Sequence, residues 1–546
     1  MPEADTAHAQ IVRRAGVVSL AVFFSRITGL VRETVFAGLF GAGMTYDAFI
    51  AAYRIPNLLR DLLAEGALSA AFVTTFSQTL TSRGQEEANL FSNRLSTLIV
   101  PFVAGICVVG AVFAPSIVTF ILPGYAEIEG KFELTVVLTR VMMPFLLFVA
   151  LAAKAMGVLN SHGRFALPAL SSGFFNITSV GAGLLFGFGL GPEFGIQPIL
   201  GMALGTLTGG FVQYVCQVPS LRAVGVRYRP EIKFSDPGVR QVLRLMGPAA
   251  IGAAAVQVNV MVNSFFASGL TDASGAVIDG PVSWLAYAFR FMQLPLGLFG
   301  LAVATATLPM ISRDAGEGRI DEFRDTLSRS LGLVFLLTIP SAVGLFVLSQ
   351  PIVGVVYQRG QFTEHDTGQT ALALSFYCLG LVGYAGTKVL TPGFYALDNV
   401  RTPMITSVAS VLVNFGLNHL FVNHLGFGHW ALALSTSLVA TFNFVCLFGF
   451  MRAEVRGIEG RRLLAGGLKI GVSSALMGVC CWLSATAIEA VMGPGTFAGR
   501  LAALAVAVPL GVGILYGLCR AMGLPELELA QRAILMRLGR GSNRTS

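Results

Sequence analysis

Long apolar segments recur along the whole chain and are separated by short polar loops. A helix needs about 20 apolar residues to cross roughly 30 Å of hydrocarbon, whereas the strands of a membrane barrel show short alternating patterns. The pattern therefore predicts an all-α polytopic membrane protein with about 14 transmembrane helices. We expect their centres near residues 22, 65, 103, 147, 177, 206, 255, 297, 336, 379, 411, 440, 474 and 508.

Composition supports a place in the bilayer. The chain has 546 residues, of which 54% are hydrophobic and 12% are charged, and its mean hydropathy is +0.72. A soluble protein of this length is about a quarter charged. Because so few charged residues cannot cover a water-facing surface, soluble classes of protein are excluded.

Basic residues are concentrated in alternate loops. The net charge is +8, and most of the 37 Lys and Arg residues lie around residues 83–94, 222–244, 313–329 and 452–469 and in the tail beyond 520. The intervening loops hold few. This asymmetry is the positive-inside pattern, so both termini are expected in the cytoplasm. It explains the basic charge without nucleic acid as a partner.

The chain resembles itself at an offset of about 235 residues. AYRIPNLL at 52–59 corresponds to AFRFMQLPLG at 288–297, which superposes Arg54 on Arg290. AAKAMGVLNSHGRFALP at 152–168 corresponds to GTKVLTPGFYALDNVRTP at 386–403. The offset contains an even number of predicted spans, so the two halves share one orientation. Parallel repeats of this kind are a known transporter plan with the site between the halves.

The repeat predicts five parts of the chain. They are an N-lobe over 1–220 with spans one to six, a basic cytoplasmic linker over 221–238, a C-lobe over 239–452 with spans seven to twelve, spans thirteen and fourteen within 453–522, and a basic cytoplasmic tail over 523–546.

Ionisable residues inside the predicted spans are the candidate substrate site. A charge within a bilayer costs several kcal/mol, so such groups face a partner or a water-filled cavity. The candidates are Arg26, Arg32, Asp47, Arg54, Arg60, Glu65 and Arg290. The alternative is that they form salt bridges that only fix helix packing, and this applies most to the acidic members. Arginine suits bidentate binding of phosphate or carboxylate, so the basic members predict an anionic substrate.

No pattern typical of an enzyme accompanies these residues. There is no Gly-rich phosphate loop ending in Lys-Ser or Lys-Thr, and the six histidines form no metal-ligand pattern. We therefore expect no enzymatic activity and no cofactor, with an ion gradient or the membrane potential as the energy source. Asn263, Asn414 and Asn418 are weak candidates for a cation site, although asparagines within spans more often bridge helices.

Four motifs resemble the MurJ (MviN) family of lipid II flippases in the MOP superfamily. They are SRITGLVRETVFAGLFGAGMTYDAF at 25–49, PNLLRDLLAEGALSAAFV at 56–73, FRFMQLPLGLFGLAVATATLP at 289–309 and KVLTPGFYALDNVRTP at 388–403. The resemblance is collinear and covers both predicted lobes.

The resemblance implies two six-helix lobes around an alternating-access cavity, with spans thirteen and fourteen forming a groove for the undecaprenyl tail. It implies that Arg26, Arg32, Arg60 and Arg290 contact the diphosphate-sugar headgroup of lipid II, with Asp47 as an acidic companion. Arg54 stands where a basic residue is usual. Some relatives use an aspartate in span seven for sodium, and the matching residue here is Asn263, which puts sodium coupling in doubt.

The predicted function is thus a flippase that moves lipid II to the outer leaflet of a bacterial plasma membrane. Its expected partners are lipid II, membrane lipids and cell-wall synthesis proteins. One alternative is a MATE-like cation or drug antiporter, which would need an acidic and aromatic cavity and no additional pair of spans. Another is a membrane-embedded enzyme or scaffold acting on polyprenyl lipids, which would need an acidic metal-binding motif or a catalytic loop.

Overall fold

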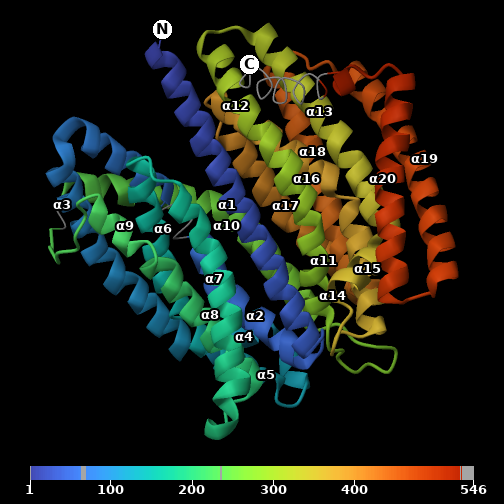
Figure 1. The fold of residues 1–546 in the computed structure, drawn as a ribbon, viewed down its shortest axis with the longest axis horizontal. Helices are drawn as coiled ribbons and strands as arrows, with labels where there is room; N and C mark the ends of the chain where they lie inside the picture. Colours follow the sequence, from blue (N-terminus) through green and yellow to red (C-terminus); the bar gives the residue numbers. More distant parts are fainter. Residues whose placement is uncertain (1, 63–68, 234–235, 529–530, 532–546) are drawn as a thin grey trace. The chain divides into compact units, whose positions relative to one another are not determined.

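The computed structural model describes residues 2–62, 69–233, 236–528 and 531. Within this part of the chain the regular structure is helical, and the β-type pairing is one isolated bridge between Thr271 and Val277. Figure 1 shows the helices in chain order. The predicted all-α fold class is confirmed.

Two compact units divide the chain, one ending at Val282 and the other beginning at Ser283. The predicted lobes were defined by the sequence repeat and not by contacts, so their boundaries stay a prediction. In this structure the helix that follows the predicted linker belongs to the first unit.

The helices of the first unit differ greatly in length. They are α1 (Pro2–Phe40), α2 (Met44–Leu59), α3 (Ser69–Val112), α4 (Ala114–Ile121), η2 (Pro123–Glu127), α5 (Lys131–Met142), α6 (Phe145–Ser161), α7 (Ala166–Leu184), η3 (Leu185–Gly189), η4 (Gly191–Phe194), α8 (Pro198–Val215), α9 (Val218–Ala223) and α10 (Pro237–Ser268). Inside α3, Gly84 has a φ of 83°, a left-handed conformation that favours glycine and breaks the helix there.

Glycines allow α7 and α8 to pack closely. A Cβ on Gly205 would lie 2.4 Å from the backbone N of Gly183, and a Cβ on Gly201 would lie 2.2 Å from the Cα of Gly187. Both helices thus meet through glycines four residues apart, as small residues commonly do between membrane helices. α7 also packs on α1, and α10 packs on α3 and α4.

The second unit repeats much of this order. Its helices are α11 (Pro281–Pro295), which starts at the boundary, η5 (Leu296–Gly300), α12 (Leu301–Gly316), α13 (Ile320–Val347), α14 (Ser349–Tyr357), α15 (Glu364–Cys378), α16 (Leu381–Ala396), α17 (Arg401–His419), η6 (Leu420–His424), α18 (Trp430–Glu454), α19 (Gly460–Met492) and α20 (Phe497–Ala521). One of its cores joins buried side chains of α12, α13, α16 and α18.

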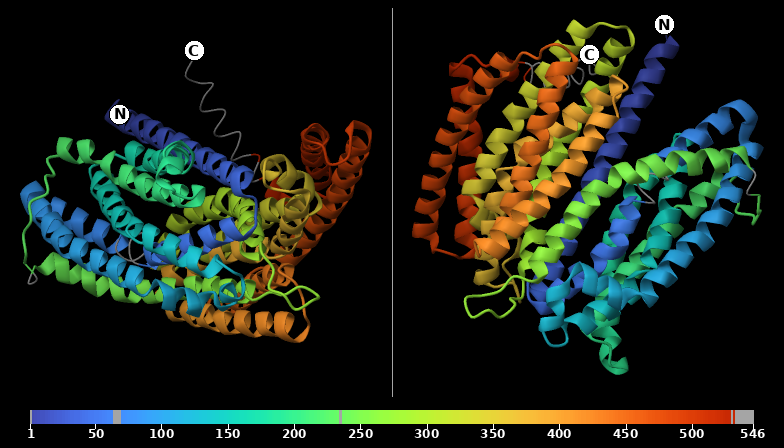
Figure 2. Two further views of the ribbon diagram at one scale, coloured as in Figure 1. Left: turned by 90° about the horizontal axis from the view of Figure 1, so that it is seen from below. Right: turned by 180° about the vertical axis from the view of Figure 1, so that it is seen from behind.

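Equivalent elements recur about 235 residues apart, in agreement with the sequence repeat. α4 corresponds to α14, the pair α5–α6 to α15–α16, and α7 to α17. The agreement extends to a detail, since α7 and α17 both end in a π-helical turn, η3 and η6. α19 and α20 follow the repeat and lie side by side (Figure 2).

Ten described helices are long and apolar enough to cross a membrane, or eleven if the bent pair α15–α16 counts as one span. The chain is thus a multi-pass membrane protein. The predicted count of fourteen is not confirmed.

Candidate functional site

Helix α1 carries the first two candidate arginines. Arg26 is exposed. Arg32 is mostly buried, with its side chain 14% exposed, and its guanidinium carbon lies 5.2 Å from the ring centre of Phe175 in α7. An Nη atom of Arg32 is 3.9 Å from a carboxylate oxygen of Glu33. The aromatic ring stabilises the cation without neutralising it.

Helix α2 presents Arg54 to a neutral partner. Nη1 of Arg54 donates a hydrogen bond of 2.7 Å to Oγ of Ser264 in α10. A hydroxyl group orients the guanidinium but does not cancel its charge, and an arginine cannot lose that charge by deprotonation. Arg54 is half-buried, so part of its surface stays accessible.

Arg60 lies at the C-terminal cap of α2 and is paired. Its Nε and Nη2 donate to one carboxylate oxygen of Asp61 at 3.1 and 2.8 Å. The other oxygen of Asp61 accepts a hydrogen bond of 3.0 Å from Gln257 of α10. The chain forms a π-helical turn at 60–62, which departs from regular α-helical spacing.

Asp47 is buried in an ion pair. Its carboxylate accepts hydrogen bonds from Nζ of Lys131 at 3.0 Å and from the backbone N–H of Gly280 at 2.9 Å. Lys131 also donates to Asp279 at 2.6 Å, and its ammonium lies 4.2 Å from the ring centre of Tyr125. Asp47 and Lys131 are both at most 1% exposed in their side chains. In this structure Asp47 therefore holds α2 to α5 and to the loop after α10.

Sequence reasoning missed Lys131 as a functional residue. It follows Glu127 and Glu129 in a predicted loop and resembles a solvated charge. The one available signal is that it is a basic residue on the side of the membrane where basic residues are rare. Its partners, Asp47 and Asp279, lie 84 and 148 residues away in the chain, so the pairing required the structure.

Two further candidates remain. Arg290 lies in α11 of the second unit and is exposed. Glu65 lies outside the described residues.

The asparagine candidates differ in their surroundings. Asn263 in α10 is half-buried. Asn414 and Asn418 of α17 are buried, and the hydroxyl of Ser435 in α18 donates to both side-chain oxygens, to that of Asn414 at 3.5 Å. Asn414 and Asn418 thus bridge α17 and α18, which is the alternative to a cation site given in the sequence analysis. A cation site there stays a prediction.

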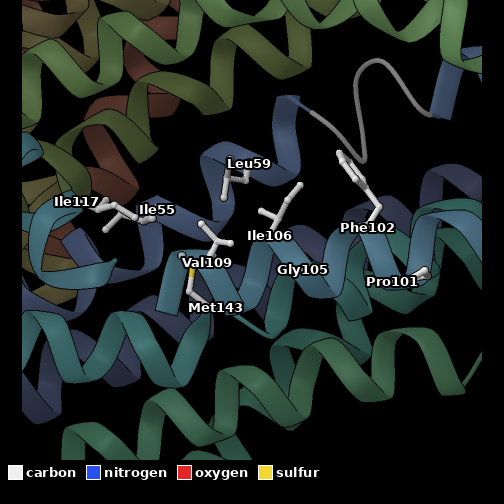
Figure 3. A pocket seen from close by; sticks show the side chains of 10 residues that line it. Ile55, Leu59, Pro101, Phe102, Gly105, Ile106, Val109, Ile117 and Met143 are labelled. Atoms are coloured by element: carbon white, nitrogen blue, oxygen red, sulfur yellow. The ribbon is translucent and has the colours of Figure 1, made fainter. Parts of the chain in front are cut away.

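The described cavity of the first unit is apolar. It measures about 530 Å³ and is lined by side chains of α2, α3 and α4, including Ile55, Leu59, Phe102 and Ile106 (Figure 3). Such a lining suits hydrocarbon and gives a diphosphate no hydrogen-bond donors.

Comparison with known proteins agrees with a helical membrane protein and shows its family. The family model described as lipid II flippase MurJ matches residues 36–502. The chain belongs to the MurJ family. The lipid II flippase MurJ of Burkholderia cenocepacia is 32% identical over 525 residues, with 94% of this chain and 98% of that protein covered. A probable lipid II flippase MurJ from Vibrio cholerae is 34% identical over 450 residues, covering 81% and 83%.

Solved structures give the same result for the fold. A lipid II flippase MurJ in an inward closed conformation matches with a TM-score of 0.73 and 27% identity, covering 92% of this chain and 99% of that one. An inward-facing multidrug resistance MATE transporter of the MOP superfamily matches with a TM-score of 0.60 and 15% identity, covering 81% and 94%. At that identity the second match shows the fold alone. The MurJ family is one of flippases and not of catalytic enzymes.

Proposed function

We propose that this protein is a lipid II flippase of a bacterial plasma membrane. Membership of the MurJ family over most of the chain is the observation that carries the proposal. The many apolar helices place the protein in a membrane, which the movement of a polyprenyl-linked substrate between leaflets requires.

The headgroup diphosphate would bind to the candidate arginines. Arg32 lies against the ring of Phe175 and Arg54 donates to Ser264, and both contacts orient a guanidinium, a group that suits bidentate binding of phosphate oxygens. Arg26 and Arg290 are exposed, so solvent and a ligand can reach their side chains. Arg60 would exchange part of its contact with Asp61 for a phosphate oxygen.

Asp47 takes a different part in this proposal. A carboxylate fully occupied by Lys131 and a backbone N–H would repel a diphosphate and offers it no donor. We infer that Asp47 positions α2, and that its contribution to transport is to stabilise one conformation of the first unit.

The transport cycle would be alternating access between two repeats in parallel orientation. The matching order of helices in the two halves of the chain supports it, because parallel repeats are a known plan of transporters. The pair α19–α20 lies outside the repeat and would hold the undecaprenyl tail. The membrane potential is the energy source that needs no cation site.

Translocation of fluorescent lipid II in proteoliposomes tests the proposal, with variants at Arg290. We expect Arg290→Ala to abolish translocation while the protein folds normally, because a bidentate contact to the diphosphate is lost. Arg290→Lys keeps the charge but loses the planar fork, so it should retain partial activity. Arg313→Ala removes an exposed arginine of α12 as the matched control and should transport normally. Full activity of Arg290→Ala would refute the proposed site.

A MATE-like antiporter is the alternative function, and the shared fold is the observation in its favour. It predicts that proteoliposomes export cationic dyes such as ethidium and do not translocate lipid II. Dye export by the wild-type protein, without lipid II translocation, would replace the flippase proposal.

A further inference from the structure

A segment without regular secondary structure lies between α9 and α10, and we call its residues 224–233 the strap. Hydrogen bonds fix it along α3. The side-chain amides of Asn89 and Asn93 donate to the backbone oxygens of Gly225 and Arg227 at 3.0 and 3.1 Å. The backbone N–H of Glu231 donates to Thr97 at 3.1 Å. The strap is thus an ordered surface and not a loose connection (Figure 1, green, beside α3).

The acidic groups of this region are neutralised internally. Between residues 216 and 245 the acidic residues are Glu231 and Asp236. Arg94 of α3 binds both, at 2.7 Å each, and its side chain is only 11% exposed. The ion pairs with Arg94 therefore neutralise both carboxylates on the side of the strap that contacts α3.

The outer side is basic and partly apolar. Six exposed residues in or next to the strap are basic, namely Arg222, Arg227, Arg229, Lys233, Arg240 and Arg244. Between them Tyr228 is 55% exposed and Ile232 is 71% exposed. Exposed Tyr and Ile beside a group of cations are typical of a surface that meets lipid headgroups, because the apolar parts enter the interface and the cations bind phosphates.

The position of the strap at the end of an apolar stretch of α3 agrees with this interpretation. The stretch of α3 from Leu95 to Val112 contains no charged residue and is long enough to span the hydrocarbon. The strap is bound to α3 from Asn89 to Thr97, at the end of that stretch. It also begins directly after the span that ends at Ala223.

We propose that the strap and the first turns of α10 form an anchor that binds an anionic phospholipid surface. The anchor would keep the N-terminal end of α10 at a constant depth relative to the membrane surface while other helices move. This role is independent of the substrate, so it stands whether or not the flippase assignment does.

Hydrogen–deuterium exchange of the full chain in nanodiscs tests the anchor. Phosphatidylcholine discs are compared with discs that also contain phosphatidylglycerol. We expect phosphatidylglycerol to slow exchange of the strap severalfold in the wild-type protein, and the effect to weaken at high salt. The triple variant Arg227→Gln, Arg229→Gln and Lys233→Gln should lose the slowing.

A matched control removes three exposed basic residues of the second unit, by Arg401→Gln, Arg452→Gln and Arg461→Gln. It changes the net charge equally and should keep the slowing at the strap. Ile232→Ser is a milder variant that should reduce the slowing, should the triple variant fold poorly. Equal loss in the control would overturn the anchor in favour of a general charge effect. Equal slowing by inorganic phosphate in phosphatidylcholine discs would overturn it in favour of a small-anion site.

Discussion

The pairing of Lys131 with Asp47 shows how burial decides the role of a charged residue. Lys131 lies among charged neighbours in the sequence and Asp47 lies in an apolar segment, yet the structure removes both side chains from solvent. A buried charge that loses its partner keeps its full desolvation penalty, whereas an exposed pair contributes little. The same residue types therefore act as structural or ligand-binding groups according to their surroundings.

Lys131→Met is predicted to destabilise the first unit by about 3–5 kcal/mol, because Asp47 is left as a buried charge. Thermal unfolding in detergent measures this cost. The double variant Lys131→Met with Asp47→Asn should lose less than the sum of the two single variants, since the charges are removed together. Arg313→Ala breaks an exposed pair with Glu317 and should leave the unfolding temperature unchanged. Additive losses in the double variant would contradict a coupled pair.

Asp236, which caps α10, gives a prediction about pH. Burial acts to raise its pKa, but hydrogen bonds from Arg94 and from the N–H groups of Val239 and Gly238 outweigh it, so the pKa lies below the ordinary value. A carboxylate with a lowered pKa stabilises the fold above its unfolded pKa, and this contribution is lost as the pH falls through the folded pKa.

Asp236→Asn keeps an oxygen that can cap the helix and removes the charge facing Arg94. We expect the variant to unfold at a lower temperature than the wild-type protein at pH 7. The difference should stay constant down to about pH 5 and shrink below about pH 4, where Asp236 of the unfolded chain becomes protonated before Asp236 of the folded protein. Unfolding temperatures of both proteins measured from pH 7 to pH 3 check this prediction. A constant difference over the whole range would show that the charge of Asp236 does not stabilise the fold.

At the scale of helices, the contact of α7 with α8 depends on the absence of side chains. Gly205→Val is predicted to destabilise the protein by about 1–3 kcal/mol or more, because the added atoms meet backbone atoms of α7 that cannot move aside. Gly181→Val is the matched control, since a Cβ there meets no atom within 4 Å. Thermal unfolding compares the two variants. An equal effect of both would mean that helix propensity, and not close packing, decides the result.

The sequence predicted helices well and their breaks poorly. Apolar windows of sufficient length identify α13, α18, α19 and α20 because hydrocarbon thickness alone sets their minimum length. The window near 147 became two helices, α5 and α6, and the one near 379 became the pair α15–α16, bent by 45°. Such breaks depend on packing against neighbouring helices, which hydropathy does not contain.

The candidate site was predictable only in part. Charged residues within apolar windows identify Arg32 and Arg54, because the cost of burying a charge makes them conspicuous. Whether a carboxylate such as Asp47 meets a ligand or a lysine depends on contacts between segments far apart in the chain. Lys131 was not predicted for that reason. The basic linker over 221–238 was predicted, but its hydrogen bonds to α3 were not.

At the scale of the whole molecule, the distribution of charge predicts which end faces the cytoplasm. Positive-inside orientation places the strap and both termini in the cytoplasm and the loop between α10 and α11 outside. A cysteine at Ile232, which is 71% exposed, and one at Ser274, which is exposed, therefore report opposite sides. The seven native cysteines are buried or half-buried, so they give a low background.

We expect a membrane-impermeant maleimide to label Ser274→Cys in intact cells and Ile232→Cys only after the cells are permeabilised. The unsubstituted protein, treated in the same way, measures the background from native cysteines. Labelling of Ile232→Cys from outside would reverse the orientation and place the strap against the outer leaflet. The arginines would then have to receive the headgroup from the opposite side, so this one measurement fixes the direction in which the proposed flippase must work.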